Sequence, residues 1–271
     1  MAIIAISGKI SSERDTVGKI IQYLTGKQPY KISIEEFIEG NHWLINYLNA
    51  NWEIKKFEKK LKEIVSILTG ISVEDLEKQE VKDRVLGEEW WYFYTEVGGK
   101  KMYPYLEYKD KPEYTTFLKK FTVRQLLQEV GTEAMRNVLH PNIWVNALFA
   151  DYNTTGFDYE GCENKEIKGS WKYPNWIISD MRFSNELEAV KDRGGITIRI
   201  NRPQQCKECK IDLIEVSDKI LTCPRCKEAF KQHVSETVLD DATFDYTIEN
   251  NAGIPELIEK VKQILKQEKI I

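Results

Sequence analysis

Short apolar runs that alternate with helical patterns constrain the fold of this chain more than any other feature. Residues 2–7 (AIIAIS) form a continuous apolar run, as expected of a strand buried on both faces, and apolar residues then recur at helical spacing over 16–24. The second half repeats this alternation, with strands predicted at 176–180, 196–200 and 244–250 and helices at 185–193 and from Pro255 onward. Strands that alternate with helices predict an α/β fold with a mainly parallel sheet covered on both faces.

The middle of the chain carries different patterns. Helical spacing predicts a helix over 52–69 with a basic outer face that includes Lys56. It also predicts helices over 72–86, with Ser72 and Asp75 as capping candidates, and over 122–139 and 142–150. An aromatic, turn-rich segment occupies 87–121, and a polar loop is predicted over 151–172. Residues 204–231 interrupt the strand and helix pattern. We therefore expect one domain over 1–271 with an insertion at 204–231.

Composition and charge argue against several classes of protein. The chain has 39 Lys and Arg against 43 Asp and Glu, a net charge of −4, so a global basic field for nucleic acid is absent. No apolar run approaches the roughly 18 residues of a membrane helix. The N-terminus has neither a basic region nor a signal-peptidase pattern, which predicts a soluble cytoplasmic protein.

Four of the five cysteines form two C-x-x-C pairs, Cys206 with Cys209 and Cys223 with Cys226, separated by 13 residues. In a cytosolic chain this spacing favours a metal over disulfides. Four thiolates can surround one Zn²⁺ tetrahedrally and leave no open position, which predicts a structural zinc ribbon. Cys162 is then the remaining cysteine, expected as a free thiol.

The segment between the first strand and the first helix has the outline of a phosphate-binding loop. The usual pattern is G-x-x-x-x-G-K-[ST]. Here Gly8 opens the loop, but Glu13 replaces the second glycine and Arg14 replaces the lysine, followed by Asp15 and Thr16. If position 13 keeps a left-handed backbone, its side chain costs roughly 1–2 kcal/mol. Spacing alone leaves an ordinary strand-to-helix turn open.

Several motifs in order resemble the phage-type deoxynucleoside monophosphate kinases, a family of P-loop kinases. That family commonly opens with ISGK-x-x-SGKDT, and this chain has ISGKISSERDT. The resemblance covers 1–25 and 120–271 well and 26–119 only loosely. Its further motifs are VRQLLQEVGTEAMR (123–136), WVNAL (144–148), WIISDMRFSNELEAVK (176–191), GGITIRINRP (194–203), HVSE (233–236) and LDDATFDYTIENN (239–251).

The resemblance implies a three-layer P-loop kinase fold with a helical substrate-binding part, and the cysteine spacing adds an inserted zinc ribbon to it. It implies transfer of the ATP γ-phosphoryl group to a deoxynucleoside monophosphate with Mg²⁺, in the host cytoplasm if the chain is phage-encoded, and it leaves a homodimer open. The implied ATP and magnesium residues are Gly8, Lys9, Ser12, Arg14 and Thr16, with Asn250 and its neighbour Asn251 near the adenine. The implied catalytic residues are Arg14, Asp15, Asp180 and Arg182.

The implied substrate residues share one helix, apart from Arg182. Arg124, Gln128, Thr132 and Arg136 recur every four residues and so form one stripe. The resemblance assigns Arg124, Gln128, Arg136 and Arg182 to the monophosphate, whose oxygens suit bidentate guanidinium groups. A solvated polar face is the alternative for the stripe, as a solvated loop lysine is for Lys9 and a helix cap for Asp180. For Asn250 and Asn251 the alternative is an ordinary turn before the final helix.

Two other functions stay open at this point. Glu13 and Arg14 depart from the family pattern, which is also what a catalytically impaired nucleotide-binding relative would have. A nucleic-acid-binding module could use the ribbon and the aromatic residues of 90–108, beside Lys100, Lys101 and Lys109. The acidic net charge favours instead a packed β-hairpin around Gly98 and Gly99. The cluster His233, Ser235 and Glu236 lacks the G-x-S-x-G elbow of a hydrolase.

Overall fold

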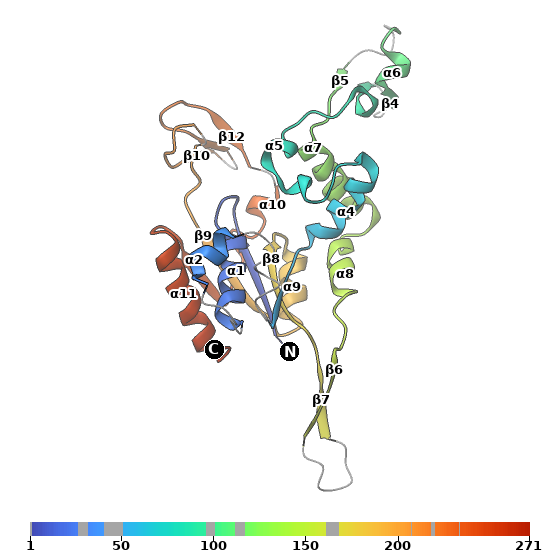
Figure 1. Cartoon of the computed structure of the whole chain (residues 1–271). Helices are drawn as coiled ribbons and strands as arrows, with labels where there is room; N and C mark the ends of the chain where they lie inside the picture. The colour runs from blue at the N-terminus through green and yellow to red at the C-terminus, as the bar shows by residue number, and fades with distance from the viewer. Residues whose placement is uncertain are drawn as a thin grey trace. The chain divides into compact units, whose positions relative to one another are not determined.

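A computed structural model describes residues 2–26, 32–40, 51–95, 101–111, 117–160, 168–206, 208–217, 220–232 and 234–271. The chain divides into two compact units (Figure 1). Unit 1 comprises Met1–Phe57 and Val145–Ile271, and unit 2 comprises Glu58–Trp144. The insertion expected at 204–231 lies in unit 1. Cys162, Lys100, His233 and the turn at Gly98 and Gly99 lie outside the described residues.

A five-stranded sheet in the order β13-β9-β1-β8-β2 organises unit 1. Every pairing between its described strands is parallel, which confirms the expected α/β fold. The order places β1, which leads into the phosphate-loop segment, between β9 and β8. The strands are β1 (Ile3–Gly8), β2 (Trp52–Lys55), β8 (Asn175–Met181), β9 (Ile196–Asn201) and β13 (Tyr246–Glu249).

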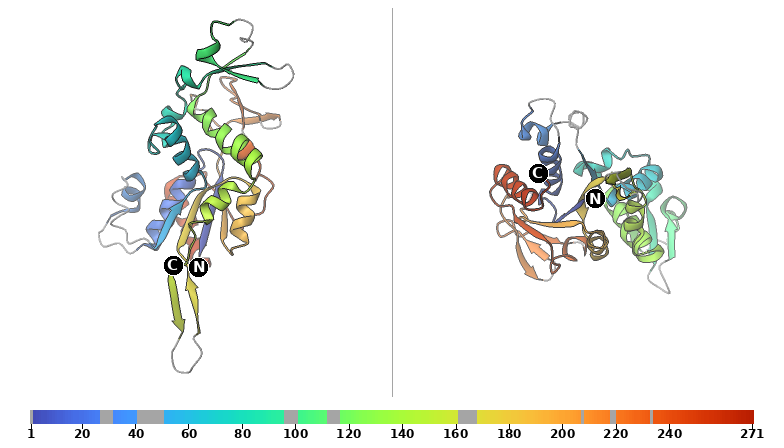
Figure 2. Two further views of the ribbon diagram at one scale, coloured as in Figure 1. Left: turned by 90° about the vertical axis from the view of Figure 1, so that its right-hand side faces the viewer. Right: turned by 90° about the horizontal axis from the view of Figure 1, so that it is seen from below.

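Helices cover both faces of this sheet (Figures 1 and 2). On one face, Val17 and Ile20 of α1 and Val261 of α11 share a core with Ile4 and Ile198 of the strands. On the other face α9 packs on β9 and β1. The continuous apolar strands that the sequence showed are thus buried on both sides. These helices are α1 (Arg14–Thr25), α9 (Ser184–Lys191) and α11 (Ile254–Gln267).

The remaining elements of unit 1 are short. Residues of the insertion form a separate antiparallel sheet in the order β10-β11-β12. The remaining short elements of unit 1 are α2 (Ile34–Glu39), β6 (Gly156–Glu160), β7 (Lys168–Lys172), β10 (Ile214–Ser217), β11 (Ile220–Thr222), β12 (Ala229–Lys231) and α10 (Val234–Thr237). Helix α8 (Ile143–Phe149) runs across the boundary between the units.

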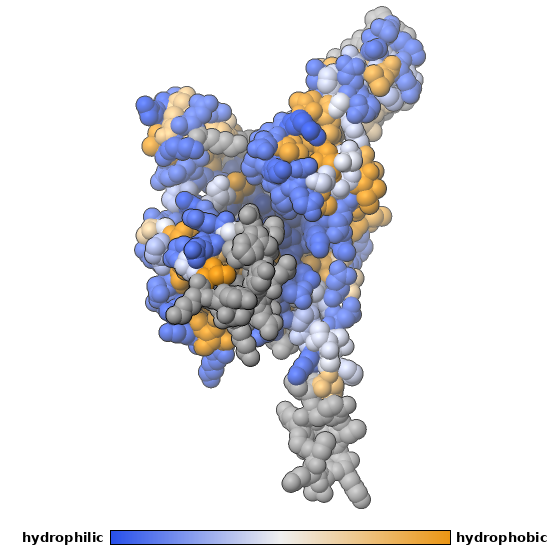
Figure 3. All heavy atoms as spheres, viewed as in Figure 1, coloured by the Kyte–Doolittle hydropathy of each residue, from blue (hydrophilic) through white to orange (hydrophobic). Residues whose placement is uncertain are grey.

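Unit 2 is mainly helical. Its core joins Val65 of α4 to Leu76, Leu86, Val123 and Leu126. On the face shown in Figure 3, hydrophobic side chains are visible in the region of α4 and α7. The elements are α4 (Glu58–Thr69), η1 (Asp75–Glu77), α5 (Gln79–Lys82), η2 (Glu88–Trp90), β3 (Tyr92–Thr95), β4 (Lys101–Pro104), α6 (Tyr105–Tyr108), β5 (Phe117–Lys119), α7 (Val123–Gln128) and the π-helix η4 (Glu129–Leu139).

The helix predicted over 52–69 is wrong in its first residues. Residues 52–55 form β2, with Ile54 opposite Ile177 of β8, and the helix begins only at Glu58. The sequence Trp-Glu-Ile-Lys alternates apolar and polar residues, and pairing with β8 satisfies its backbone groups while it buries Trp52. Lys56 therefore leaves the predicted basic helix face and follows a strand.

Two further predictions are corrected. Residues 72–86 are not one helix, because Lys78 is extended between η1 and α5, although the Ser72 hydroxyl does accept the Asp75 N–H. This break accompanies a 2.7 Å ion pair between Glu77 and the buried ammonium of Lys62. The loop predicted over 151–172 contains instead the antiparallel strands β6 and β7. Cross-strand packing of the Phe157 and Trp171 rings supports that pairing.

The aromatic segment is a small antiparallel sheet in the order β4-β3-β5, which confirms the expected hairpin. Rings pack within it, as Phe93 does against Tyr105, with 5.4 Å between centroids. Within the described part of the chain, no helix combines the length and apolar character needed to cross a bilayer.

Candidate active site

Neighbouring atoms pack closely around Gly8, the last residue of β1, where the loop begins. Any side chain at Gly8 would collide with its surroundings, because a Cβ there would lie 2.8 Å from the carbonyl oxygen of Ile200. Further on, Ser11 and Glu13 adopt left-handed backbone conformations, with φ of 63° and 74°. The glycine position of the phosphate-loop pattern thus keeps the conformation that glycine favours, although glutamate occupies it.

The Glu13 carboxylate has two partners. Its Oε1 accepts a hydrogen bond from Nη1 of Arg202 at 2.6 Å, and its Oε2 accepts one from the Thr16 hydroxyl at 2.7 Å. Arg202 also donates to the carbonyl oxygen of Ser11 at 3.3 Å. The charge that the sequence placed beside the loop is therefore paired with a cation.

Two polar groups of the loop are buried without a hydrogen-bond partner among the described residues, namely Nη1 of Arg14 and the hydroxyl of Ser12. Burial, with the nearby Arg182 guanidinium, lowers the pKa of Arg14 to about 10. A buried cation and hydroxyl beside a helix N-terminus form a site that an anion would complete.

The Asp15 carboxylate lies in the first turn of α1. It accepts a hydrogen bond from the Ser179 hydroxyl at 2.7 Å and pairs with the Lys56 ammonium at 3.1 Å. Partial burial alone would raise the pKa of Asp15, but the Lys56 charge and these hydrogen bonds outweigh it and lower that pKa below its usual value. Asp15 is therefore ionised at neutral pH, and its carboxylate is largely exposed.

Asp180 and Arg182 follow one another at the carboxyl end of β8. Asp180 is buried, and its Oδ1 accepts the Phe57 N–H at 2.9 Å. Arg182 forms an ion pair with Glu236, whose other oxygen accepts the Ile10 N–H at 2.7 Å. The charges of Asp15, Asp180, Arg182 and Glu236 all act on Arg14, so the four predicted catalytic residues share one cluster.

Sequence reasoning missed three residues of this cluster: Lys56, Arg202 and Glu236. Lys56 was placed on a helix face, and only the pairing of β2 brings it to Asp15. Arg202 and Glu236 fall inside motifs that were recognised, GGITIRINRP and HVSE, but nothing in their spacing points to the loop. Their contacts cross 189 and 226 positions of sequence, which local patterns cannot reveal.

A cleft of about 470 Å³ opens beside the loop, at the carboxyl ends of β9 and β13. Lys9 lies in its lining and pairs with Asp240 at 2.9 Å, and Asn251 lines it as well. Asn250 does not line it: its amide is buried and donates to the carbonyl oxygen of Ser12 at 3.4 Å. This contact favours support of the loop by Asn250 over direct contact with a base.

The predicted substrate stripe lies entirely in unit 2. Arg124 and Gln128 belong to α7, while Thr132 and Arg136 belong to the π-helix η4, and all four are half-buried. A π-helix has more residues per turn than an α-helix, so residues four apart stay near one face where α7 and η4 join. Arg124 already bonds Asp83 at 2.8 Å and Gln79 at 2.8 Å.

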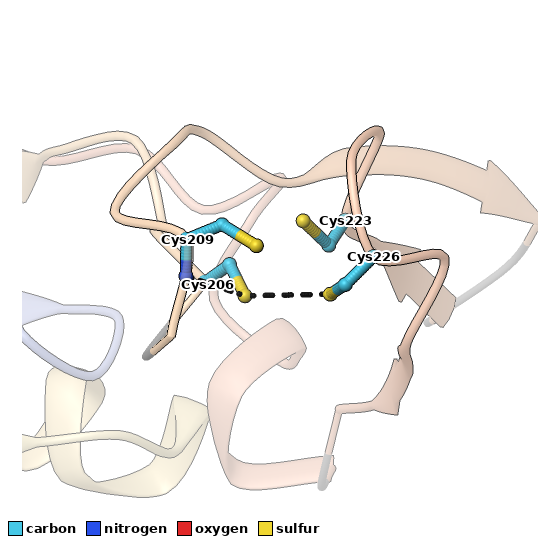
Figure 4. A group of neighbouring side chains, drawn as sticks. All are labelled: Cys206, Cys209, Cys223 and Cys226. Atoms are coloured by element: carbon cyan, nitrogen blue, oxygen red, sulfur yellow. Dashed lines mark hydrogen bonds between the residues drawn. The ribbon is translucent and has the colours of Figure 1, made fainter.

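The four cysteines of the two pairs come together at one end of the insertion (Figure 4). Their sulfur atoms all lie within 4.8 Å of one another, and 3.7 Å separates those of Cys206 and Cys226. Burial opposes ionisation of Cys223, but backbone N–H groups of Cys226 and Arg225 lower its pKa to about 7. The cluster has the ligands and spacing to hold a metal ion.

Comparison with known proteins places the chain in a family. A family model described as deoxynucleotide monophosphate kinase matches residues 2–215. The chain belongs to the deoxynucleotide monophosphate kinase family. The deoxynucleotide monophosphate kinases of Enterobacteria phage T4 and Escherichia phage RB69 are 24% and 25% identical over 149 and 150 residues, in each case 54% of this chain and 46% of the relative. A protein of Acanthamoeba polyphaga mimivirus is 28% identical over 114 residues, 40% of this chain and 52% of that protein.

The chain spans about half the length of these curated relatives. The family match includes β1, the loop, α1 and β8, where Arg14 and Asp180 lie, and it includes the whole of unit 2. It ends inside the insertion, so that Cys206 and Cys209 fall within it while Cys223 and Cys226 follow it.

Proposed function

We propose that this member of the deoxynucleotide monophosphate kinase family transfers the γ-phosphoryl group of ATP to a deoxynucleoside monophosphate, giving ADP and the diphosphate. One observation carries the proposal beyond family membership. In the loop that connects β1 to α1, one guanidinium nitrogen of Arg14, Nη1, and the Ser12 hydroxyl are buried without hydrogen-bond partners among the described residues, and a triphosphate would supply those partners.

Phosphoryl transfer depends on positioning and on charge stabilisation. The backbone of 8–16 and the Ser12 hydroxyl would hold the phosphates, while Arg14 takes the place of the usual lysine and follows the charge on the transferring group. Gly8 leaves room for the Ser12 hydroxyl and the Ile200 carbonyl oxygen, and the Asn250 amide donates to the carbonyl oxygen of Ser12. Lys9 and Asn251 line the adjacent cleft, which we assign to the adenosine part of ATP.

Asp15, Asp180 and Thr16 are the proposed magnesium residues. Carboxylate and hydroxyl oxygens are the ligands that Mg²⁺ prefers, and Mg²⁺ when bound would neutralise charge on the β- and γ-phosphates. Lys56 already balances the charge of Asp15. It would have to release that carboxylate when the metal enters.

Guanidinium groups are the proposed contacts of the monophosphate, because they bind phosphate oxygens bidentately. In unit 2 the proposed guanidinium contact is Arg136, and Gln128 of the same stripe is a further proposed contact. Arg124 could bind the monophosphate only after it releases Asp83, to which it is hydrogen-bonded. Arg182 in unit 1 stays a proposed substrate residue as well. Glu236 fixes its orientation.

Zinc is the proposed metal of the insertion. A tetrahedral Zn²⁺ with Zn–S bonds of about 2.3 Å places its sulfurs about 3.8 Å apart. The sulfur atoms of Cys206 and Cys226 are 3.7 Å apart, which matches that separation. With four protein ligands the ion would be structural.

An assay of ADP release with ATP, Mg²⁺ and each deoxynucleoside monophosphate tests the proposal. Release that requires both the monophosphate and Mg²⁺ supports it. Binding of ATP without turnover would instead identify an impaired relative, consistent with the departures at Glu13 and Arg14. Failure to bind ATP at all would refute the assignment of the loop.

A further inference from the structure

Both chain segments that flank the cysteine insertion contact the phosphate loop. On the entering side, Arg202 lies two residues before the insertion, and its guanidinium donates to the carbonyl oxygen of Ser11 at 3.3 Å and to the Glu13 carboxylate at 2.6 Å. These two contacts fall on the two loop residues with left-handed backbones.

The leaving side contacts the other half of the loop. Glu236, in α10 just after the insertion, is 6% exposed and accepts the Ile10 N–H at 2.7 Å. Four residues further on, Asp240 pairs with Lys9 at 2.9 Å. Residues 9, 10, 11 and 13 of the loop are therefore each held by a side chain that flanks the insertion.

The two sides are also joined to each other at the base of the insertion. Gln232, on the leaving side, donates to the side-chain oxygen of Gln204, on the entering side, at 2.7 Å. Within the insertion, the Leu213 N–H donates to the Gln204 carbonyl oxygen at 2.7 Å. From this base the chain leads directly to Cys206. The metal ligands and the loop contacts are thus separated by only a few residues on the entering side.

The insertion has little apolar core of its own. Strand β10 is exposed along its length, with Ile214 and Val216 51% and 58% exposed, whereas Cys206, Leu221 and Cys223 are buried. A segment of this size that buries so few apolar side chains needs a metal or another cross-link to fold. Loss of the ion would therefore release both flanking sides.

The loop, in turn, depends on its surroundings. A left-handed conformation costs a non-glycine residue roughly 1–2 kcal/mol and persists only where neighbouring contacts hold it. For Ser11 and Glu13 those contacts include Arg202. The loop would relax if the flanking side chains lost their fixed positions.

We propose that metal occupancy of the four cysteines controls the conformation of the phosphate loop, with Arg202 and Glu236 as the positioning residues that connect the two. The metal-bound form holds residues 8–16 ready for a triphosphate, and the metal-free form does not. This inference rests on the proposed phosphate-binding role of the loop and on the proposed zinc site, and it adds a link between them.

The test compares the full chain loaded with Zn²⁺ and depleted by a chelator under reducing conditions, then reloaded. Hydrogen exchange of residues 8–16 reports the loop, exchange of 204–232 reports the insertion, and titration with ATP reports affinity. We expect depletion to raise exchange in both segments and to weaken ATP binding by about tenfold, a typical size for coupling between sites, with recovery on reloading.

Variants separate coupling from general damage. Arg202→Gln and Glu236→Gln should show raised exchange in 8–16 even with Zn²⁺ bound, and depletion should add little. Glu215→Gln, the same change at an exposed position of β10, should behave like the unmodified chain. Exchange in 8–16 that stays unchanged while 204–232 unfolds would overturn the link.

Failure of the kinase proposal gives a different result. If neither form binds ATP but exchange in 8–16 still follows the metal, the link stands and the assignment of the loop to ATP falls. If both forms bind ATP equally, the assignment stands and the link falls. If elemental analysis finds no metal and chelation changes neither segment, the link also falls.

Discussion

Glu13 accepts a hydrogen bond from the hydroxyl of Thr16, with 2.7 Å between Oε2 and Oγ1. The glutamate that replaces the loop glycine thus faces the first turn of α1, and its second oxygen pairs with Arg202. The loop has adapted to the replacement: it keeps the left-handed backbone and supplies partners for the new carboxylate.

This arrangement predicts the effect of restoring glycine. Glu13→Gly should raise the free energy of unfolding by about 1 kcal/mol, because relief of a strain of roughly 1–2 kcal/mol exceeds the value of a partly exposed ion pair. Combined with Arg14→Lys it should leave ATP affinity unchanged or lower, since the Arg202 contact is lost. Chemical denaturation and ATP titration measure both quantities. Glu13→Gln is the control, because it keeps the backbone strain and removes the charge. A tenfold gain in ATP affinity of the double variant would contradict the conclusion that the loop has adapted to Glu13.

The burial of Arg14 predicts that one substitution has opposite effects on stability and on ATP binding. Arg14→Met removes a buried guanidinium nitrogen that has no hydrogen-bond partner among the described residues, so the nucleotide-free protein should become more stable by about 1–3 kcal/mol, the cost of such an unsatisfied group. ATP binding should weaken by about 100-fold, because the phosphates lose a buried cation. Thermal unfolding with and without ATP tests both parts. A variant that loses stability but still binds ATP would show that Arg14 has a structural role.

Asp15 predicts a pH dependence. Its pKa is lowered in the folded chain, so its contacts stabilise the protein above the unfolded pKa, and that contribution is lost as the pH falls through the folded value. The difference in unfolding free energy between the unmodified chain and Asp15→Asn should therefore be largest near neutral pH and shrink below about pH 4. Denaturant titrations across pH 3–7, without Mg²⁺, measure it. A difference that is constant with pH would mean that the Lys56 contact does not stabilise the fold.

The substrate stripe contains two arginines with different predicted roles. Arg136→Ala should weaken use of the monophosphate by about 2–4 kcal/mol, the scale of an unpaired phosphate charge. Arg124→Ala should instead lower stability by about 0–1 kcal/mol, because Arg124 forms a partly exposed pair with Asp83. Steady-state kinetics and denaturation on both variants distinguish the roles. Unchanged monophosphate kinetics in Arg136→Ala and in Arg182→Ala would refute the assigned phosphate contacts.

The cysteine cluster predicts about one Zn²⁺ per chain, since its four thiolates match a closed site. Chelation should raise hydrogen exchange in 204–231 more than in the strands of the parallel sheet, whose core does not include the cluster. Elemental analysis and exchange measurements check these two points. Freely titratable thiols without stoichiometric metal would rule out the zinc site.

The sequence by itself determined the parallel sheet, the loop and the cysteine cluster, because each rests on local periodicity or on fixed spacing. Apolar runs such as residues 176–180 are strands because they are buried on both faces, and two C-x-x-C pairs fold toward one centre. The same locality explains the errors. Residues 52–55 carry both a helical and an alternating pattern, and only β8, more than a hundred residues away, decides between them.

Tertiary structure alone decided how the loop is held. Nothing local relates Glu13 to Arg202, Ile10 to Glu236 or Asp15 to Lys56, because these partners come from separate strand ends, turns and a short helix that only the tertiary structure brings together. Electrostatic contacts act through space and require no sequence spacing, so a charged residue in a recognised motif gives no indication of its partner. The residue types of the site could be found from the sequence, while their pairing, burial and strain depend on the folded chain.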